Sequence, residues 1–192
     1  LRMTGRLLWQ EGGEQPPPHS RFILAFSSGR IVLVDPRRFA TLAVGDGALR
    51  RERATDALSP GCVDALIEKS SRRRCSVKSL LLDQQVVGGI GNIYACELLY
   101  RAGISPWRQA AELSPDEWRR IGEAAAAILS RAIDCRGTSI SDWRDLFGRP
   151  GEYQEELRVY SREGRPCPRC RGTIRRERLL VRGTWFCPNC QD

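Results

Sequence analysis

Four cysteines in the last quarter of the chain restrict its fold more than any other feature. They form two Cys-x-x-Cys pairs, Cys167–Cys170 and Cys187–Cys190, separated by residues 171–186. This spacing is typical of a tetrahedral Zn²⁺ site with four thiolate ligands, in which two short turns face each other across one ion. The sequence therefore predicts a zinc-pinned β-hairpin that holds one Zn²⁺ through Cys167, Cys170, Cys187 and Cys190.

The segment between the two pairs is rich in arginine. Its basic residues are Arg171, Arg175, Arg176, Arg178 and Arg182, and its one acidic residue is Glu177. Because a metal-pinned hairpin holds guanidinium groups at fixed positions, this pattern indicates binding to a phosphate backbone. The 192-residue chain as a whole has 31 basic and 23 acidic side chains, a net charge of +8, which also favours a polyanionic partner.

The other four cysteines have no metal-ligand spacing. They are Cys62, Cys75, Cys96 and Cys135. A secreted disulfide framework is the alternative, but free cysteine commonly packs as a small apolar residue, so a reducing, cytoplasmic compartment is expected. No apolar stretch reaches the roughly 20 residues of a membrane span, and no membrane association is expected.

The pattern of apolar and turn residues divides the chain into three predicted domains, 1–50, 51–150 and 151–192. The first is predicted to be β, because the apolar runs 21–27 and 30–34 meet around Ser28-Gly29, a hairpin signal. The second is predicted to be helical. Three of its helices are expected at Asp64–Glu68, from about Val77 to Val87, and from Asn92 onwards.

The fourth helix has the clearest start. Ser114 is the expected N-cap, Pro115 occupies the first helical position, and Glu117 completes a capping box. Apolar residues follow at helical spacing, and Gly137 ends the helix. These apolar residues are Trp118, Ile121, Ala125, Ile128, Leu129 and Ala132.

Two turns have the chemistry of a nucleic-acid contact. The glycine-rich turn 88–92 presents backbone N–H groups and the Asn92 amide, which could bind an anion. The alternative is that the turn is an ordinary connection between two helices. In Asp35-Pro-Arg-Arg-Phe39, the ring could wedge between bases and a guanidinium could replace an extruded base. A solvated turn with Phe39 in the core is the alternative. The only histidine, His19, does not complete a nucleophilic pair.

Five segments together resemble the formamidopyrimidine-DNA glycosylase family. They occur in that family's order and are residues 1–5, 35–39, 82–95 and 156–160 and the two cysteine pairs. The resemblance implies an α+β fold that combines part of a β-sandwich domain, a helix-two-turn-helix domain and a four-cysteine zinc finger. It also implies a monomeric bacterial base-excision repair glycosylase and abasic-site lyase. Its partner would be double-stranded DNA with an abasic site or an oxidised purine, 8-oxoguanine or formamidopyrimidine, flipped out of the helix.

The resemblance also implies roles for individual residues. Residues matching the trio that fills the gap left by the flipped base are Met3, Arg37 and Phe39. Residues matching those that bind phosphates around the lesion are Asn92, Tyr160 and Arg182, and Arg182 also matches a residue assigned to the second (δ) elimination. Residues matching further DNA contacts are His19, Arg38, Arg74 and Lys78.

One departure from the family is severe. The family's nucleophile is an N-terminal proline followed by glutamate, and no residue of this sequence matches either. We therefore expect the chain to lack the N-terminal catalytic segment and to be inactive alone. An endonuclease VIII-like glycosylase is an alternative, although Ile93–Ala95 and the Met/Arg/Phe trio favour the formamidopyrimidine branch. A non-catalytic zinc-dependent DNA-binding module and a zinc ribbon for RNA or protein contacts also remain open.

Overall fold

The described residues form two compact units. The computed structural model describes residues 1, 4–42, 54–140 and 143–192. The first unit takes in residues 1–51 and 132–155, and the second takes in residues 52–131 and 156–192. The chain thus passes between the units three times. The predicted domain boundaries at residues 50 and 150 stay predictions.

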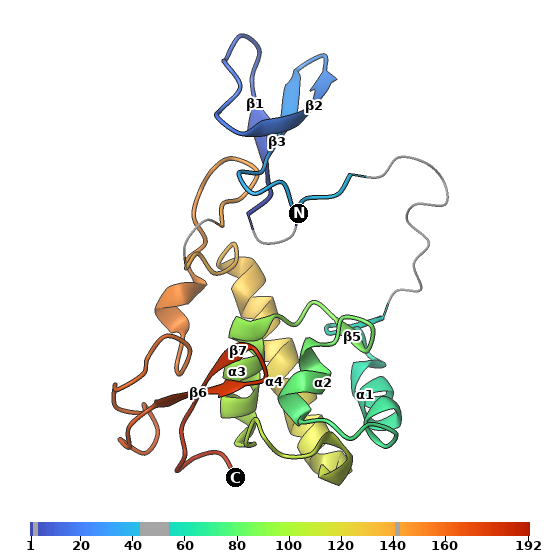
Figure 1. The fold of residues 1–192 in the computed structure, drawn as a ribbon, viewed down its shortest axis with the longest axis vertical. Coiled ribbons are helices and arrows are strands. Elements are labelled where there is room, and N and C mark those ends of the chain that lie inside the picture. The colour runs from blue at the N-terminus through green and yellow to red at the C-terminus, as the bar shows by residue number, and fades with distance from the viewer. Residues whose placement is uncertain (2–3, 43–53, 141–142) are drawn as a thin grey trace. The chain divides into compact units, whose positions relative to one another are not determined.

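A three-stranded antiparallel sheet is the centre of the first unit (Figure 1). Its strands are β1 (Arg6–Gln10), β2 (Ser20–Phe26) and β3 (Gly29–Val34), in the order β1-β3-β2. The hairpin predicted around Ser28-Gly29 is confirmed, with Phe26 pairing with Gly29 across a turn at residues 27–28. Strand β1 was not predicted, because its three apolar residues include none with a β-branched side chain.

The central strand β3 supplies the buried side chains of this sheet. Val32, Leu33 and Val34 are all buried. The edge strand β1 is also tied to the segment 132–155, because Trp9 N donates a hydrogen bond to Leu146 O at 2.7 Å. Two stretches that are far apart in the sequence therefore build one unit.

The second unit contains most of the helical residues of the described chain (Figure 1). The α-helices of the described chain are α1 (Cys62–Ser70), α2 (Val77–Leu82), α3 (Asn92–Ala102) and α4 (Pro115–Asp134). The last three residues of α4 already belong to the first unit. Short 3₁₀ turns are η1 (Ala110–Glu112) and η2 (Tyr153–Glu156).

Two strand pairs complete the second unit. The two-residue strands β4 (Thr55–Asp56) and β5 (Val87–Gly88) pair in parallel. Near the C-terminus, β6 (Arg175–Leu179) and β7 (Arg182–Phe186) form an antiparallel hairpin, drawn in red beside α3 in Figure 1. This is the hairpin predicted between the cysteine pairs.

The predicted helix from Val77 to Val87 is wrong at its C-terminal end, since α2 stops at Leu82. The cause is Asp83, whose Oδ1 accepts a hydrogen bond from Gln85 N at 2.9 Å. A side chain that bonds the backbone two residues ahead forms an Asx-turn, which competes with continuation of the helix. Val87 then pairs with Thr55 as a strand.

The capping box of α4 is confirmed. Ser114 N donates to Glu117 Oε2 at 2.8 Å, and Glu117 N donates to Ser114 Oγ at 3.3 Å. All six predicted apolar positions of this helix are buried. A Cβ atom at Gly122 would lie 2.3 Å from Val63 Cγ2, so this glycine lets α1 approach α4 closely. The helix ends at Asp134, and Gly137, with a φ of 85°, follows in the left-handed conformation.

Candidate nucleic-acid interface

The four cysteines of the two pairs come together at the base of the β6–β7 hairpin. Their Sγ atoms all lie within 4.8 Å of one another. Sγ of Cys167 is 3.9 Å from that of Cys190, and Sγ of Cys170 is 3.5 Å from that of Cys187. A tetrahedron of Zn–S bonds of about 2.3 Å places its sulfur atoms about 3.8 Å apart, so the cluster fits one Zn²⁺.

The zinc knuckle is fastened to the C-terminal end of α3. The Arg169 guanidinium donates to Tyr100 O at 2.7 Å and to Arg101 O at 3.0 Å, and it lies 4.4 Å from the centre of the Tyr100 ring. The last carbonyls of a helix lack intrahelical partners and carry partial negative charge, so a cation fits there. Gln191 adds a second link by donating to Ile104 O at 2.9 Å.

Two side chains of the helical region bind the finger at the start of β7, next to Arg182. Lys78 Nζ, from α2, donates to Gly183 O at 3.1 Å and to Thr184 Oγ1 at 2.7 Å. Asn92 Nδ2, from the start of α3, donates to the same Gly183 carbonyl at 3.1 Å. Lys78 and Thr184 are both buried, and burial lowers the pKa of the Lys78 ammonium, a shift that the neighbouring Cys96 thiol opposes. The backbone immediately after Arg182 is therefore fixed from two helices.

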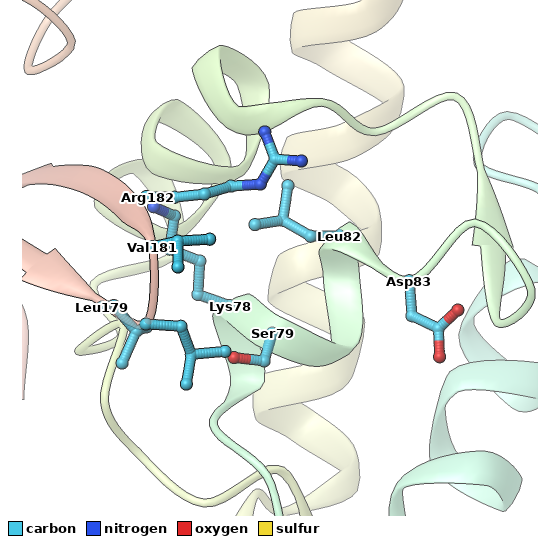
Figure 2. Close-up of a pocket in the computed structure, with 8 residues that line it drawn as sticks. Lys78, Ser79, Leu82, Asp83, Leu179, Val181 and Arg182 are labelled. Carbon is cyan, nitrogen blue, oxygen red and sulfur yellow. The ribbon is translucent and has the colours of Figure 1, made fainter.

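Exposed residues gather at the tip of this hairpin. Leu180 and Val181 are 78% and 93% exposed, and Leu180 has a φ of 54°, which fits a tight turn. Figure 2 shows Val181 and Arg182 from the hairpin beside Lys78 and Leu82 from α2. Between the two elements lies a hollow of about 160 Å³. Its lining residues are Lys78, Ser79, Leu82, Asp83, Leu179, Leu180, Val181 and Arg182.

The glycine-rich turn leads directly into this interface. Gly91 is the N-cap of α3, and as a glycine it has no side chain to satisfy the first N–H groups of the helix. Gly89 adopts a φ of 95°, and the Gln84 side chain bridges the turn by accepting from Gly89 N and donating to Ile90 O. The N-terminus of α3 is thus a preformed place for an anion, and the Asn92 side chain also hydrogen-bonds Tyr160.

Tyr160 is positioned by a buried carboxylate on α3. Glu97 accepts hydrogen bonds from the backbone N–H groups of Arg158, Val159 and Tyr160, at 2.9, 2.9 and 2.8 Å. Burial raises the pKa of the Glu97 carboxyl, and these three donors work against that rise. The Tyr160 ring packs 4.2 Å from the ring of Trp185 on β7. Tyr160 and the hairpin are therefore held against the same helix.

The turn after β3 presents its predicted residues to solvent. Arg37, Arg38 and Phe39 are exposed, and the Arg37 guanidinium lies 5.5 Å from the centre of the Phe39 ring. The alternative in which Phe39 enters the core is wrong, since its side chain is 52% exposed. His19 is exposed with a φ of 66°, and Met3 lies outside the described residues.

Comparison with known proteins assigns the helical region and the finger. The family model described as "Formamidopyrimidine-DNA glycosylase H2TH domain" matches residues 54–143, and the one described as "Zinc finger found in FPG and IleRS" matches residues 164–192. A formamidopyrimidine-DNA glycosylase of Desulfitobacterium hafniense is 39% identical over 198 residues, covering 100% of this chain and 72% of the relative. One from Roseiflexus is 41% identical over 197 residues, with the same coverage. The chain belongs to the formamidopyrimidine-DNA glycosylase family.

Solved structures of the family have the same fold. MutM (Fpg) of Thermus thermophilus is 37% identical with a TM-score of 0.87, and the match covers 99% of this chain and 73% of that one. Lactococcus lactis Fpg in complex with an abasic-site DNA is 30% identical with a TM-score of 0.86, covering 99% of this chain and 72% of that one. The α+β fold with a helix-two-turn-helix region and a zinc finger is thereby confirmed.

The zinc finger of this family member is the part that sequence reasoning described best. The finger domain and the four close cysteines confirm one Zn²⁺ as the cofactor. The structure also brings together four predicted DNA contacts, Lys78, Asn92, Tyr160 and Arg182, around α3 and the hairpin. Arg74 is exposed between α1 and α2.

None of the helices in the described ranges combines the length and apolarity that a bilayer crossing requires.

Three residues that organise the interface were missed from the sequence of this family member. Glu97, Thr184 and Asp35 are buried polar residues that hold the predicted contacts in place. A signal existed for Glu97, because it is an acid within the apolar stretch 95–99 of a predicted helix. Thr184 has no comparable signal, since its partner Lys78 is about a hundred residues away in the chain.

Proposed function

We propose that this chain is the DNA-binding part of a base-excision repair glycosylase and lyase for oxidised purines, 8-oxoguanine and formamidopyrimidines. The observation that carries the proposal is the attachment of the Arg182 hairpin to the helix-two-turn-helix region through Lys78 and Asn92. Membership of the family supports it. So do the complexes that Lactococcus lactis Fpg forms with DNA containing Fapy-dG or an abasic site.

Phosphates of the lesion strand are the proposed ligands of the second unit. Asn92 offers its backbone N–H at the start of α3, where the helix dipole attracts an anion. Arg182 lies on an exposed hairpin and presents a guanidinium fork that matches phosphate oxygens. Tyr160 lies beside the hairpin and adds a hydroxyl donor. Arg182 would also assist the δ-elimination, by its position next to the phosphate that leaves.

The exposed turn of the first unit is the proposed gap filler. Phe39 would stack between bases, Arg37 would bond the base opposite the lesion, and Met3 would act with them. Further DNA contacts are assigned to His19, Arg38 and Arg74, which are exposed. A direct contact of Lys78 with DNA stays a prediction, since its Nζ faces the hairpin.

Binding to an abasic-site duplex tests the phosphate role of Arg182. We expect Arg182→Ala to weaken binding about tenfold and to lower the slope of log Kd against log salt by about one, as expected for one lost phosphate contact. The matched control is Arg101→Ala, which removes the same charge in the last turn of α3, at the end opposite Asn92. An equal loss of affinity in the two variants would show that net charge alone explains binding.

Borohydride trapping tests the activity of the 192-residue polypeptide itself. A Schiff base requires an amine at the lesion, and the family's N-terminal proline and glutamate have no counterpart among these residues. We therefore expect this polypeptide to bind an 8-oxoguanine duplex without forming a covalent adduct. A trapped adduct contradicts that expectation. Equal affinity for intact and abasic duplexes would instead favour a general nucleic-acid or protein-binding module.

A further inference from the structure

One buried carboxylate closes the turn that carries Arg37 and Phe39. Asp35 follows β3 and is fully buried, and its Oδ2 accepts a hydrogen bond from Ala40 N at 2.7 Å. Its backbone carbonyl accepts from Arg38 N at 3.4 Å. The carboxylate therefore joins the first and last residues of the turn, while Arg37 and Phe39 remain exposed between them.

Thr4 connects this carboxylate to the guanidinium. Its hydroxyl donates to Asp35 Oδ1 at 2.8 Å and accepts from Arg37 Nε at 3.3 Å. The Arg37 guanidinium is also within cation–π distance of the Phe39 ring. These contacts engage Nε and one face of the guanidinium, so its other N–H donors stay available for a ligand.

The attachment of Asp35 to the sheet does not depend on its carboxylate. Asp35 N donates to His19 O at 3.1 Å, and Asp35 O accepts from Arg21 Nε at 2.9 Å. Both bonds are made by the main chain of Asp35. The carboxylate instead serves the turn and Thr4. The hydrogen bond from Ala40 N, followed by that from Thr4, keeps the pKa of Asp35 low despite its burial.

We propose that Asp35 and Thr4 are positioning residues, which hold Arg37 and Phe39 in the geometry that reads the base opposite a flipped-out nucleotide. This inference rests on the proposed function. Without the carboxylate and the hydroxyl, the turn loses the side chains that close it, and Arg37 must be ordered when DNA binds. The conformational entropy that Arg37 then loses weakens binding.

Asp35 and Thr4 would affect one step of recognition, the reading of the base opposite the flipped-out nucleotide. A guanidinium can donate two hydrogen bonds to adjacent acceptors, such as N3 and O2 of an unpaired cytosine, whereas adenine offers one acceptor beside a donor. A fixed Arg37 therefore discriminates cytosine from adenine across an abasic site. A mobile Arg37 loses that discrimination, although phosphate binding by the second unit continues.

The experiment compares four forms of the 192-residue chain: unaltered, Thr4→Val, Thr4→Ser and Asp35→Asn. Dissociation constants are measured for intact duplex and for abasic-site duplexes with cytosine or adenine opposite the site. We expect Thr4→Val and Asp35→Asn to reduce the cytosine-to-adenine affinity ratio by about tenfold, within the range of a bidentate base contact. Affinity for intact duplex should stay within about twofold, and Thr4→Ser, which keeps the hydroxyl, should retain the ratio.

A double-mutant cycle separates positioning from general damage to the fold. In an Arg37→Ala background, Thr4→Val should have no further effect on the ratio, because the group it positions is gone. An unchanged ratio in Thr4→Val, an additive effect in the double variant, or equal losses on intact and abasic DNA would each overturn the positioning role. If the unaltered chain shows no preference for abasic over intact duplex, the proposed function fails first.

Discussion

Three buried charged side chains act on the backbone of segments that carry predicted DNA contacts. Asp35 closes the turn of the first unit, Lys78 binds the finger hairpin, and Glu97 binds the segment ending at Tyr160. A buried charge is tolerated only where hydrogen bonds replace its hydration, so each partner segment is restrained in return. At the scale of single residues, the exposed contacts are thus positioned by charged groups beneath them.

The capping box of α4 predicts a pH dependence of stability. Hydrogen bonds from Arg108, then from Ser114, lower the pKa of Glu117. The stability that its carboxylate contributes is therefore present above the unfolded-state pKa of about 4.3 and is lost as the pH falls through the lower folded-state value. We expect Glu117→Gln to cost about 1 kcal/mol at pH 7 and much less at pH 3, measured by urea unfolding.

The control for this substitution is Glu123→Gln. Glu123 lies on the same helix and is exposed, so its removal should change the unfolding free energy by less than about 0.5 kcal/mol at both pH values. If Glu117→Gln and Glu123→Gln give the same difference between pH 7 and pH 3, the capping carboxylate is not the source of the pH dependence.

At the scale of elements, α3 is the common support of the interface. Asn92 at its first residue contacts the hairpin, Glu97 in its middle holds the Tyr160 segment, and Tyr100 near its end receives Arg169 of the zinc knuckle. One rigid helix therefore sets the spacing of the three predicted phosphate contacts, Asn92, Tyr160 and Arg182. Its length, eleven residues, is about 16 Å from end to end.

Elements with local determinants were predictable from the sequence, and elements with distant partners were not. The capping box of α4 and the cysteine spacing of the finger lie within short windows, and both predictions are confirmed. Strand β1 depends on pairing with β3, which its own residues do not reveal. The end of α2 is an exception, because the local Asx-turn of Asp83 sets it and apolar periodicity does not detect such a turn. Within the candidate site, contact residues were accessible through motifs, whereas Thr184 required knowledge of which helix it faces.

At the scale of the whole chain, we expect loss of zinc to weaken DNA binding strongly and to change the helix content little. Removal of Zn²⁺ leaves the thiolates to repel one another and releases the base of the hairpin, while α1, α2 and α4 keep their buried faces. We expect Cys170→Ser to lose stoichiometric zinc and to weaken binding to an abasic duplex at least tenfold, with a small change in far-ultraviolet circular dichroism.

Cys75→Ser is the matched control, because Cys75 is a cysteine outside the metal cluster. It should keep one zinc per chain and the affinity of the unaltered protein. Zinc content by metal analysis and Kd by fluorescence anisotropy measure the two effects. Full DNA affinity in a zinc-free Cys170→Ser variant would show that DNA binding does not require the metal.

The three passages of the chain between its units constrain how genes of this family can exchange segments. The main chain of Trp9 bonds to that of Leu146, and the Glu97 carboxylate bonds to the main chain of Tyr160, so these partnerships span overlapping stretches of the coding sequence. A crossover between codons 10 and 146 gives the first pair two different parents, and one between codons 97 and 160 does the same to the second. The first bond joins main-chain atoms and survives such an exchange, whereas the second requires that the parent contributing codon 97 supplies an acid there.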